Sequence, residues 1–305
     1  MQFPRKLNLA FILALFGCSL FLGAQQGNFN RDLQYFFSDH YGALDTTFTS
    51  IKNSSTTFLI GVEHDSLANG LKYDNLTKWH HKLLLNDNWL TVKGKDYKIT
   101  FDPYHNFLIG KETVAAGNLW TNKRGVIFNA ALGKKIKVYS TIDEGTFAPD
   151  PFTNEYVRTT RITPGEGETK FTDNYFNNSN SSGTIEIDVN SFFDVTFGHG
   201  KNFLGEGYRS LFLSDAARSY PFLKLDLTIG KRVKYTSIVA EFIHYTPDMQ
   251  ALGDVVRQKK YGSFHYLDIK LGKKLFVGLF ESVIWGGDPS SRSSFDINYL
   301  NPFVI

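Results

Sequence analysis

The strongest constraint on the fold is a two-residue alternation of apolar and polar side chains that begins near residue 96. In "FLKLDLTI", one face of the extended chain carries Leu223, Leu225, Leu227 and Ile229, and the other carries Lys224, Asp226 and Thr228. "GTIEIDV" (183–189) and "FHYLDIKL" (264–271) repeat the scheme. Because successive side chains of a strand point to opposite sides of a sheet, the pattern predicts strands with one oily and one charged face.

The connections between these segments alternate in length. Gly-Lys-Lys or Gly-Lys-Arg lies between two alternating runs at 132–139, 229–235 and 271–278, where glycine supplies the positive φ of a tight hairpin turn. Longer polar connections are expected at 145–183, 246–262 and 286–302. This alternation is typical of an up-and-down antiparallel sheet with one plain rim and one decorated rim.

Two all-β architectures fit such a pattern. A soluble sandwich would bury the oily faces between two sheets, whereas an outer-membrane barrel would turn them toward lipid. "KRVKYTSIVAEFIHYTP" is long for a sandwich strand and has aromatic residues toward its ends, which favours the barrel. We therefore expect an outer-membrane β-barrel over 96–305. Since "NPFVI" reads as the start of another strand, we expect the C-terminal strands to be missing and the barrel to be incomplete.

The first residues read as an export signal. Arg5 and Lys6 precede an apolar run, and the small residues Gly23 and Ala24 offer a cleavage site, which predicts a signal peptide over 1–24. An uncleaved anchor and lipidation of Cys18 are the alternatives. Apolar residues at helical spacing between Phe29 and Phe37 predict a small, partly helical region over 25–95.

Composition and motifs argue against nucleic-acid binding and against catalysis. The net charge of +3 is small and scattered, so no basic patch indicates a nucleic-acid partner. The histidines lack metal-ligand spacing, a GxSxG elbow is missing, and Asp143 and Glu144 point to opposite faces of a strand. We predict a protein that is not an enzyme and that has no cofactor or metal.

A glycine-rich stretch, "FGHGKNFLGEGYRSLFLSDAARSYPFLKL" (197–225), does not fit a nucleotide loop. It lacks both GxxxxGK followed by Ser or Thr and a complete GxGxxG, and its surroundings are antiparallel. Its glycines are expected to let the backbone bend, fold inward or lie close against a barrel wall; they are Gly198, Gly200, Gly205 and Gly207.

The same stretch resembles the signature of the Wzi capsule assembly family, and most closely its RemB-like gliding-motility branch in the Bacteroidetes. "NKRGVIFNAALGKKIKVYSTIDE" (122–144) and "SFDINYLNP" (294–302) are similar to that family too. The resemblance implies an outer-membrane barrel with a small helical N-terminal portion, in a Gram-negative bacterium. It also implies lipid, surface polysaccharide and gliding-machinery proteins as partners. The family's Trp-Gly-Pro-Gly element is replaced here by Leu204-Gly205-Glu206-Gly207.

Within that stretch, five side chains form a dense set of planar and hydrogen-bonding groups, which are Tyr208, Arg209, Ser214, Asp215 and Arg218. Such groups suit sugar hydroxyls and faces. An internal salt-bridged plug that stiffens the barrel explains the same residues. The sequence therefore predicts a non-enzymatic barrel that binds or anchors surface polysaccharide or assists gliding. A passive pore or transporter and a soluble extracellular β-sandwich binding module remain as alternatives.

Overall fold

The computed structural model describes residues 51–52, 78–79, 88–112, 118–172, 175–205, 210–247, 255–272, 275–286 and 296–301. The predicted signal peptide and most of the predicted helical region therefore lie outside the described residues. Within the described ranges, no helix is both long enough and apolar enough to cross a membrane.

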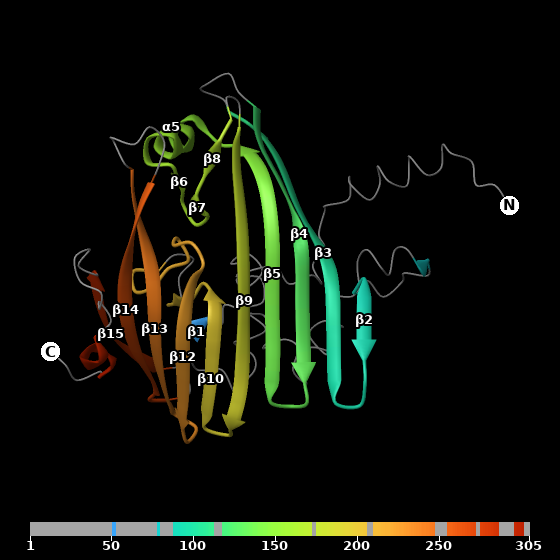
Figure 1. The fold of residues 1–305 in the computed structure, drawn as a ribbon. Coiled ribbons are helices and arrows are strands. Elements are labelled where there is room, and N and C mark those ends of the chain that lie inside the picture. The colour runs from blue at the N-terminus through green and yellow to red at the C-terminus, as the bar shows by residue number, and fades with distance from the viewer. Residues whose placement is uncertain are drawn as a thin grey trace.

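One large antiparallel sheet of eleven strands dominates the structure (Figure 1). Its spatial order is β15-β14-β13-β12-β10-β9-β5-β4-β3-β2, with β8 paired to β9, so its main strands follow one another as in the chain. The all-β, up-and-down antiparallel arrangement predicted from the alternation is confirmed. Among the described residues, no pairing joins β15 to β2, and the sheet is a curved open layer.

The main strands are long and share nearly uniform register. Their bounds are β2 Leu90–Lys93, β3 Tyr97–Lys111, β4 Asn118–Leu132, β5 Ile136–Ala148, β9 Phe176–Asn190, β10 Phe193–Gly200, β12 Tyr220–Ile229, β13 Val233–Pro247, β14 Val255–Lys270 and β15 Phe276–Gly286. The sheet thus begins at Leu90, ahead of the residue 96 at which the alternation becomes clear.

The two faces of the sheet have inverted polarity. The outer face, which includes Leu223 and Leu225, is open, and Leu223 is 42% exposed. The inner face, which includes Lys224 and Asp226, is covered, and Lys224 is only 3% exposed. Ile142 on the outer face of β5 is 59% exposed, whereas its neighbour Asp143 on the inner face is buried. On β5 and β12 the charged side chains Asp143, Lys224 and Asp226 therefore face inward.

The short hairpins have the predicted turn chemistry. Gly133 between β4 and β5 and Gly230 between β12 and β13 both have a φ of 62°, which non-glycine residues rarely adopt. The Gly-Lys-Lys turn at 272–274 is only partly described.

The connection predicted over 145–183 is largely structured, which corrects the sequence interpretation. β5 continues to Ala148, and helix α5 (Pro151–Thr160) follows. The short strands β6 (Ile162–Thr163), β7 (Gly167–Glu168) and β8 (Lys170–Phe171) precede β9, which begins at Phe176. Likewise, β14 begins at Val255, inside the connection predicted over 246–262. Alternation is weak at the start of β9 because that end is rich in Asn and Ser, and at the start of β14 because polar and charged residues follow one another there.

Helix α5 starts at a defined cap. The Asp150 side chain accepts hydrogen bonds from the Thr153 amide (3.0 Å) and the Thr153 hydroxyl (2.6 Å), and proline occupies the first helical position. These hydrogen bonds lower the pKa of Asp150 below its ordinary value. Val157 is completely buried against Phe147 and Phe176, which fixes the helix at the upper end of the sheet in Figure 1.

We predict that Asp150→Ala destabilises α5 by about 1 kcal/mol, because two cap hydrogen bonds are lost. Hydrogen exchange of the Thr153 and Asn154 amides should accelerate, and Asp150→Asn should retain most of the protection. Because the Asp150 pKa is lowered in the folded state, the cap is at full strength above the ordinary aspartate pKa and weakens as the pH falls through the lowered value. Unchanged exchange in Asp150→Ala would contradict the capping role.

Candidate functional site

The glycine-rich stretch forms a segment that folds back over the inner face between β10 and β12. After Gly200 the chain leaves the sheet, and β11 (Phe203–Leu204) pairs antiparallel with β1 (Ile51–Lys52). The Leu204 amide also donates to the Leu213 carbonyl at 3.0 Å. The chain returns to the sheet at Tyr220, whose hydroxyl accepts a hydrogen bond from the Asn202 amide at 3.1 Å. We call residues 201–219 the inward segment.

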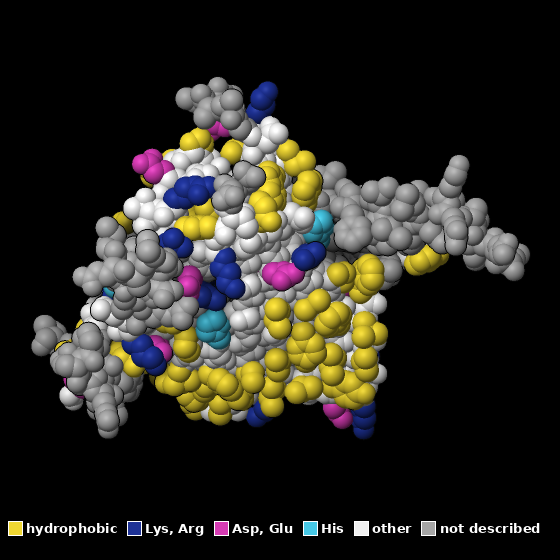
Figure 2. Space-filling view, turned by 45° about the horizontal axis from the view of Figure 1, so that its top comes forward, with side chains coloured by type: hydrophobic (Ala, Val, Ile, Leu, Met, Phe, Trp, Pro, Cys, Tyr) yellow, Lys and Arg dark blue, Asp and Glu magenta, His cyan; other side chains and the backbone are white. Residues whose placement is uncertain are grey.

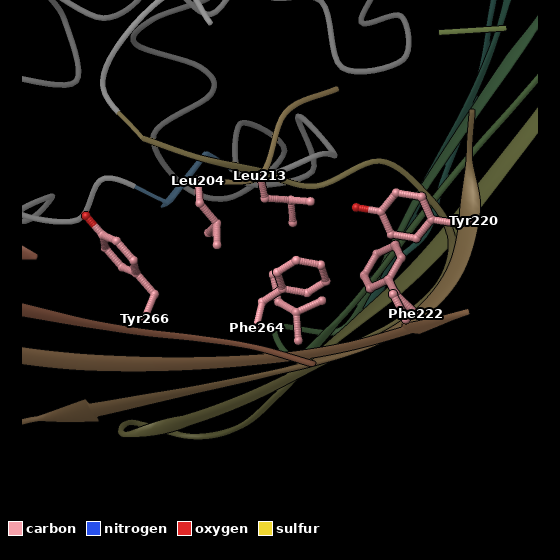
Figure 3. Packing of buried hydrophobic residues seen from close by; sticks show 8 residues of the cluster. Leu204, Leu213, Tyr220, Phe222, Phe264 and Tyr266 are labelled. Carbon is pink, nitrogen blue, oxygen red and sulfur yellow. The ribbon is translucent and has the colours of Figure 1, made fainter. Parts of the chain in front are cut away.

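Apolar side chains hold the inward segment against the inner face of the large sheet, which we call the wall. Figure 3 shows Leu204 and Leu213 pointing toward aromatic side chains of the sheet, including Phe222 and Phe264. The buried cluster consists of Leu204, Leu213, Tyr220, Phe222, Ile238, Ala240, Phe264 and Tyr266. Burial of this much apolar surface is the main force that keeps the segment on the inner face.

Glycines allow the close approach that this packing requires. A Cβ on Gly198 would lie 2.2 Å from the Gly183 carbonyl oxygen and 2.7 Å from the Thr184 Cα, both of which are backbone atoms of β9. Gly205 has a φ of 131° and would place a Cβ 2.9 Å from the Ser210 hydroxyl. Gly200 differs, since its nearest neighbours are side-chain atoms at 3.5 Å and 3.6 Å. Gly207 lies outside the described residues.

The hairpin of β6 and β7 meets the inward segment at its tip. The Gly165 amide donates to the Ala216 carbonyl at 2.8 Å. The Lys201 ammonium donates to the Gly165 carbonyl at 2.6 Å and to the Asp215 carbonyl at 3.2 Å. Gly167 has a φ of 87°, and a Cβ there would lie 2.4 Å from the Arg218 Cδ. The hairpin and the inward segment therefore form one interlocked body, called the plug below.

Charged groups of the wall complete this junction. Glu166, at the hairpin tip, pairs with the Lys123 ammonium of β4. It also accepts a hydrogen bond from the side-chain amide of Asn180 on β9. Asp143 of β5 faces the same space. Burial lowers the pKa of Lys201 below its ordinary value, and the neighbouring Glu166 and Asp215 partly oppose that shift. The junction is a cluster of partly buried charges that neutralise one another.

Three of the five predicted ligand residues lie together in this junction. The Ser214 hydroxyl accepts a hydrogen bond from the Ala216 amide at 3.3 Å, and the Asp215 backbone carbonyl accepts one from the Lys201 ammonium. The Arg218 side chain lies against Gly167. Tyr208 and Arg209 lie outside the described residues. The arrangement agrees with a plug and leaves partly exposed Arg and Asp groups that can bind hydroxyls.

Sequence reasoning missed the wall residues Lys123, Asp143 and Asn180 and the hairpin residue Glu166. The alternation does assign Lys123, Asp143 and Asn180 to one face, but no sequence signal says that β4, β5 and β9 bring them together. Glu166 lies in "PGEGE", where the flanking glycines indicate a turn and give no partner.

An open cavity of about 500 Å³ lies between α5 and the ends of β3, β4 and β5. Its polar lining comes from Glu112, Asn118, Asn154, Glu155, Arg158 and Thr159. The Arg158 guanidinium donates to the Asn154 side chain at 2.7 Å and lies 5.3 Å from the centre of the Phe176 ring. This cavity offers donors and acceptors at the rim opposite the short hairpins.

Comparisons with known proteins leave the family undecided, since no protein-family model, no curated protein and no solved structure matches the chain. Within the described ranges, no group of three or more His, Cys, Asp or Glu side chains could hold a metal ion. The functional argument therefore depends on the geometry of the chain itself.

We predict that Gly198→Ala impairs folding while Gly200→Ala is tolerated. A methyl group at residue 198 would collide with the backbone of β9, and overpacking of this kind costs about 1–3 kcal/mol. The folded fraction after refolding into detergent micelles or lipid vesicles measures the effect. Equal folding yields for the two variants would contradict the close-approach role of Gly198.

Proposed function

We propose that the chain is the wall and plug of an outer-membrane β-barrel that is not an enzyme and that anchors surface polysaccharide. The observation that carries the proposal is the inverted polarity of the sheet. In water, an open face rich in Leu, Ile, Val and Phe is unfavourable, whereas in a bilayer it is the face that contacts lipid.

The extent of the oily face supports a membrane band. On β4 and β5 the outer face is mainly apolar from Val126 to Leu132 and from Ile136 to Ile142. Seven residues of strand cover about 23 Å, which is comparable to the roughly 25 Å apolar band of outer-membrane barrels. Figure 2 shows hydrophobic side chains gathered over the lower part of the visible face, with charged side chains above them.

Ion pairs on the outer face mark the upper limit of that band. Arg124 and Glu144 pair at 2.9 Å and have exposed side chains. They lie two residues beyond Val126 and Ile142 on their strands. Farther along the same outer face, Glu241 of β13 and Lys259 of β14 pair at 2.9 Å. Charges of both signs at this level suit the headgroup region and the water beyond it.

The inner face supports an enclosed polar interior. Asp226 of β12 lies between Lys224 (3.5 Å) and Lys234 (3.6 Å) and accepts a hydrogen bond from Thr236. Lys137 of β5 pairs with Glu186 at 3.0 Å and with Asp188 at 3.4 Å. A sandwich would have to place these paired charges on its surface and bury the leucines, which is the opposite of the exposure in this sheet.

The apolar plug favours an anchor over a pore. The inward segment covers the inner face of β12, β13 and β14 with a packed aromatic core, and water-filled channels need a polar, open lumen. Polysaccharide contact is supported by the Arg and Asp groups near the plug and by the polar cavity at the same end as α5. The resemblance of residues 197–225 to the Wzi capsule assembly family points to the same role.

We predict that Leu225→Arg reduces the folded fraction in lipid vesicles strongly, because an arginine at the centre of the lipid-facing band costs about 2–4 kcal/mol. Ser181→Arg is the matched control, since Ser181 is exposed on the same face beyond the apolar stretch of β9. If Leu225→Arg folds as well as Ser181→Arg, the lipid-facing assignment is wrong.

We predict that Arg218→Ala lowers retention of surface polysaccharide without preventing barrel assembly. Arg232→Ala, in a short hairpin at the opposite rim, should leave retention unchanged. Cell-bound polysaccharide is measured by extraction, and assembly by the amount of heat-modifiable protein in outer-membrane fractions. Normal retention with Arg218→Ala would show that Arg218 does not bind polysaccharide. Conductance of the purified protein in planar bilayers would favour the alternative function, a passive pore.

A further inference from the structure

A polar cluster interrupts the oily outer face on β13, β14 and β15. Its members are Tyr235, Ser237, Ser263, His265 and Glu281, and we call it the polar seam. Strand register places these residues on the outer face, because Ser237 pairs with Leu225 on one side and with His265 on the other, and His265 pairs with Glu281. Polar groups that faced acyl chains here would be unfavourable.

The polar seam has an internal hydrogen-bond network. The Tyr235 hydroxyl and His265 Nδ1 lie 2.6 Å apart, and the Ser263 hydroxyl and His265 Nε2 lie 3.0 Å apart. The Tyr235 and His265 rings stack with an interplanar angle of 9°. Both nitrogens of the imidazole are therefore within hydrogen-bond distance of a hydroxyl.

The seam is covered although it lies on an exposed face. His265 is 6% exposed and Ser263 is completely buried, whereas Leu279, on the same face of β15, is 56% exposed. The backbone of Tyr299 hydrogen-bonds His265, and the Tyr299 ring lies 4.8 Å from that of Trp285 on β15. In Figure 1 the helix η2 (Ile297–Leu300) lies beside β15.

The covering segment has its own defined conformation. Asp296 accepts a hydrogen bond from the Asn298 amide at 2.9 Å, and Asn301 donates to the Asn298 carbonyl at 3.2 Å. These bonds satisfy backbone groups that would otherwise be exposed at the sheet surface. We call Asp296–Asn301 the strap.

We infer that the strap is a protein cover over the polar seam, so that this arc of the outer wall contacts protein instead of lipid. The inference rests on the proposed membrane placement of the outer face. It follows that His265 helps to hold the strap, and that the lipid-facing surface of β13, β14 and β15 is interrupted at the level of the polar seam.

Bromolipid quenching of tryptophan fluorescence tests the cover directly. The chain has four tryptophans, so replacing Trp79, Trp89 and Trp120 by phenylalanine leaves Trp285 as the single probe. Trp285 lies at the level of Glu241 because both residues pair with Tyr261, so the vesicles contain phosphatidylcholine brominated close to the headgroups. In these vesicles, Trp285 should be quenched weakly. Tyr299→Ala, which removes the ring that contacts Trp285, should raise quenching about twofold or more as local opening exposes the probe. His265→Leu should have the same effect, because it removes the hydrogen-bonding imidazole and leaves the seam more apolar.

A reference probe separates the two hypotheses. Ile142→Trp, in a chain that has no other tryptophan, should be quenched strongly by the same lipid because Ile142 is 59% exposed on the outer face of β5, at the upper edge of the apolar band. If this probe is shielded, the proposed membrane placement fails whatever the strap does. If it is quenched and Trp285 is quenched equally in the parent chain, the strap inference is overturned. Shielding of Trp285 that survives both Tyr299→Ala and His265→Leu would also overturn it.

Discussion

Opposed polarity on the two faces of a single sheet is the constraint on which the rest of the structure depends. Apolar burial ordinarily drives folding by removing oily side chains from water, yet here Leu223 and Ile142 stay open while Lys224 and Asp226 are covered. Only a solvent that prefers the leucines makes that arrangement favourable. The proposed membrane placement rests on this one inversion.

The plug covers part of the charged inner face of the sheet. An interior with several unpaired charges would be costly, and Lys123, Lys137 and Lys224 each lie near a carboxylate. Apolar burial is not abandoned either, since Leu204 and Leu213 bring a conventional core to the inner face. The glycine-rich stretch therefore serves mainly to let a polypeptide segment reach the wall, and its polar residues meet the hairpin tip.

The polar seam shows the same rule at a smaller scale. Where the outer face carries His265 and Ser263 in place of leucine, protein covers it, and where it carries Leu279 it is open. On the outer face of the strands, the apolar side chain Leu279 is exposed and the polar side chains His265 and Ser263 are buried. That regularity links the wall, the plug and the strap without appeal to a particular family.

The amino-acid sequence by itself determined the strand periodicity, the face assignment within each strand and the tight glycine turns, because these are local properties with a period of two. It did not determine the 145–183 segment, where Asn, Ser and Thr carry no apolar alternation. Only the tertiary structure decided which face is covered and that Glu166 meets Lys123 and Asn180. Such contacts join segments far apart in the chain, and they depend on how the sheet curves and how the inward segment fills it.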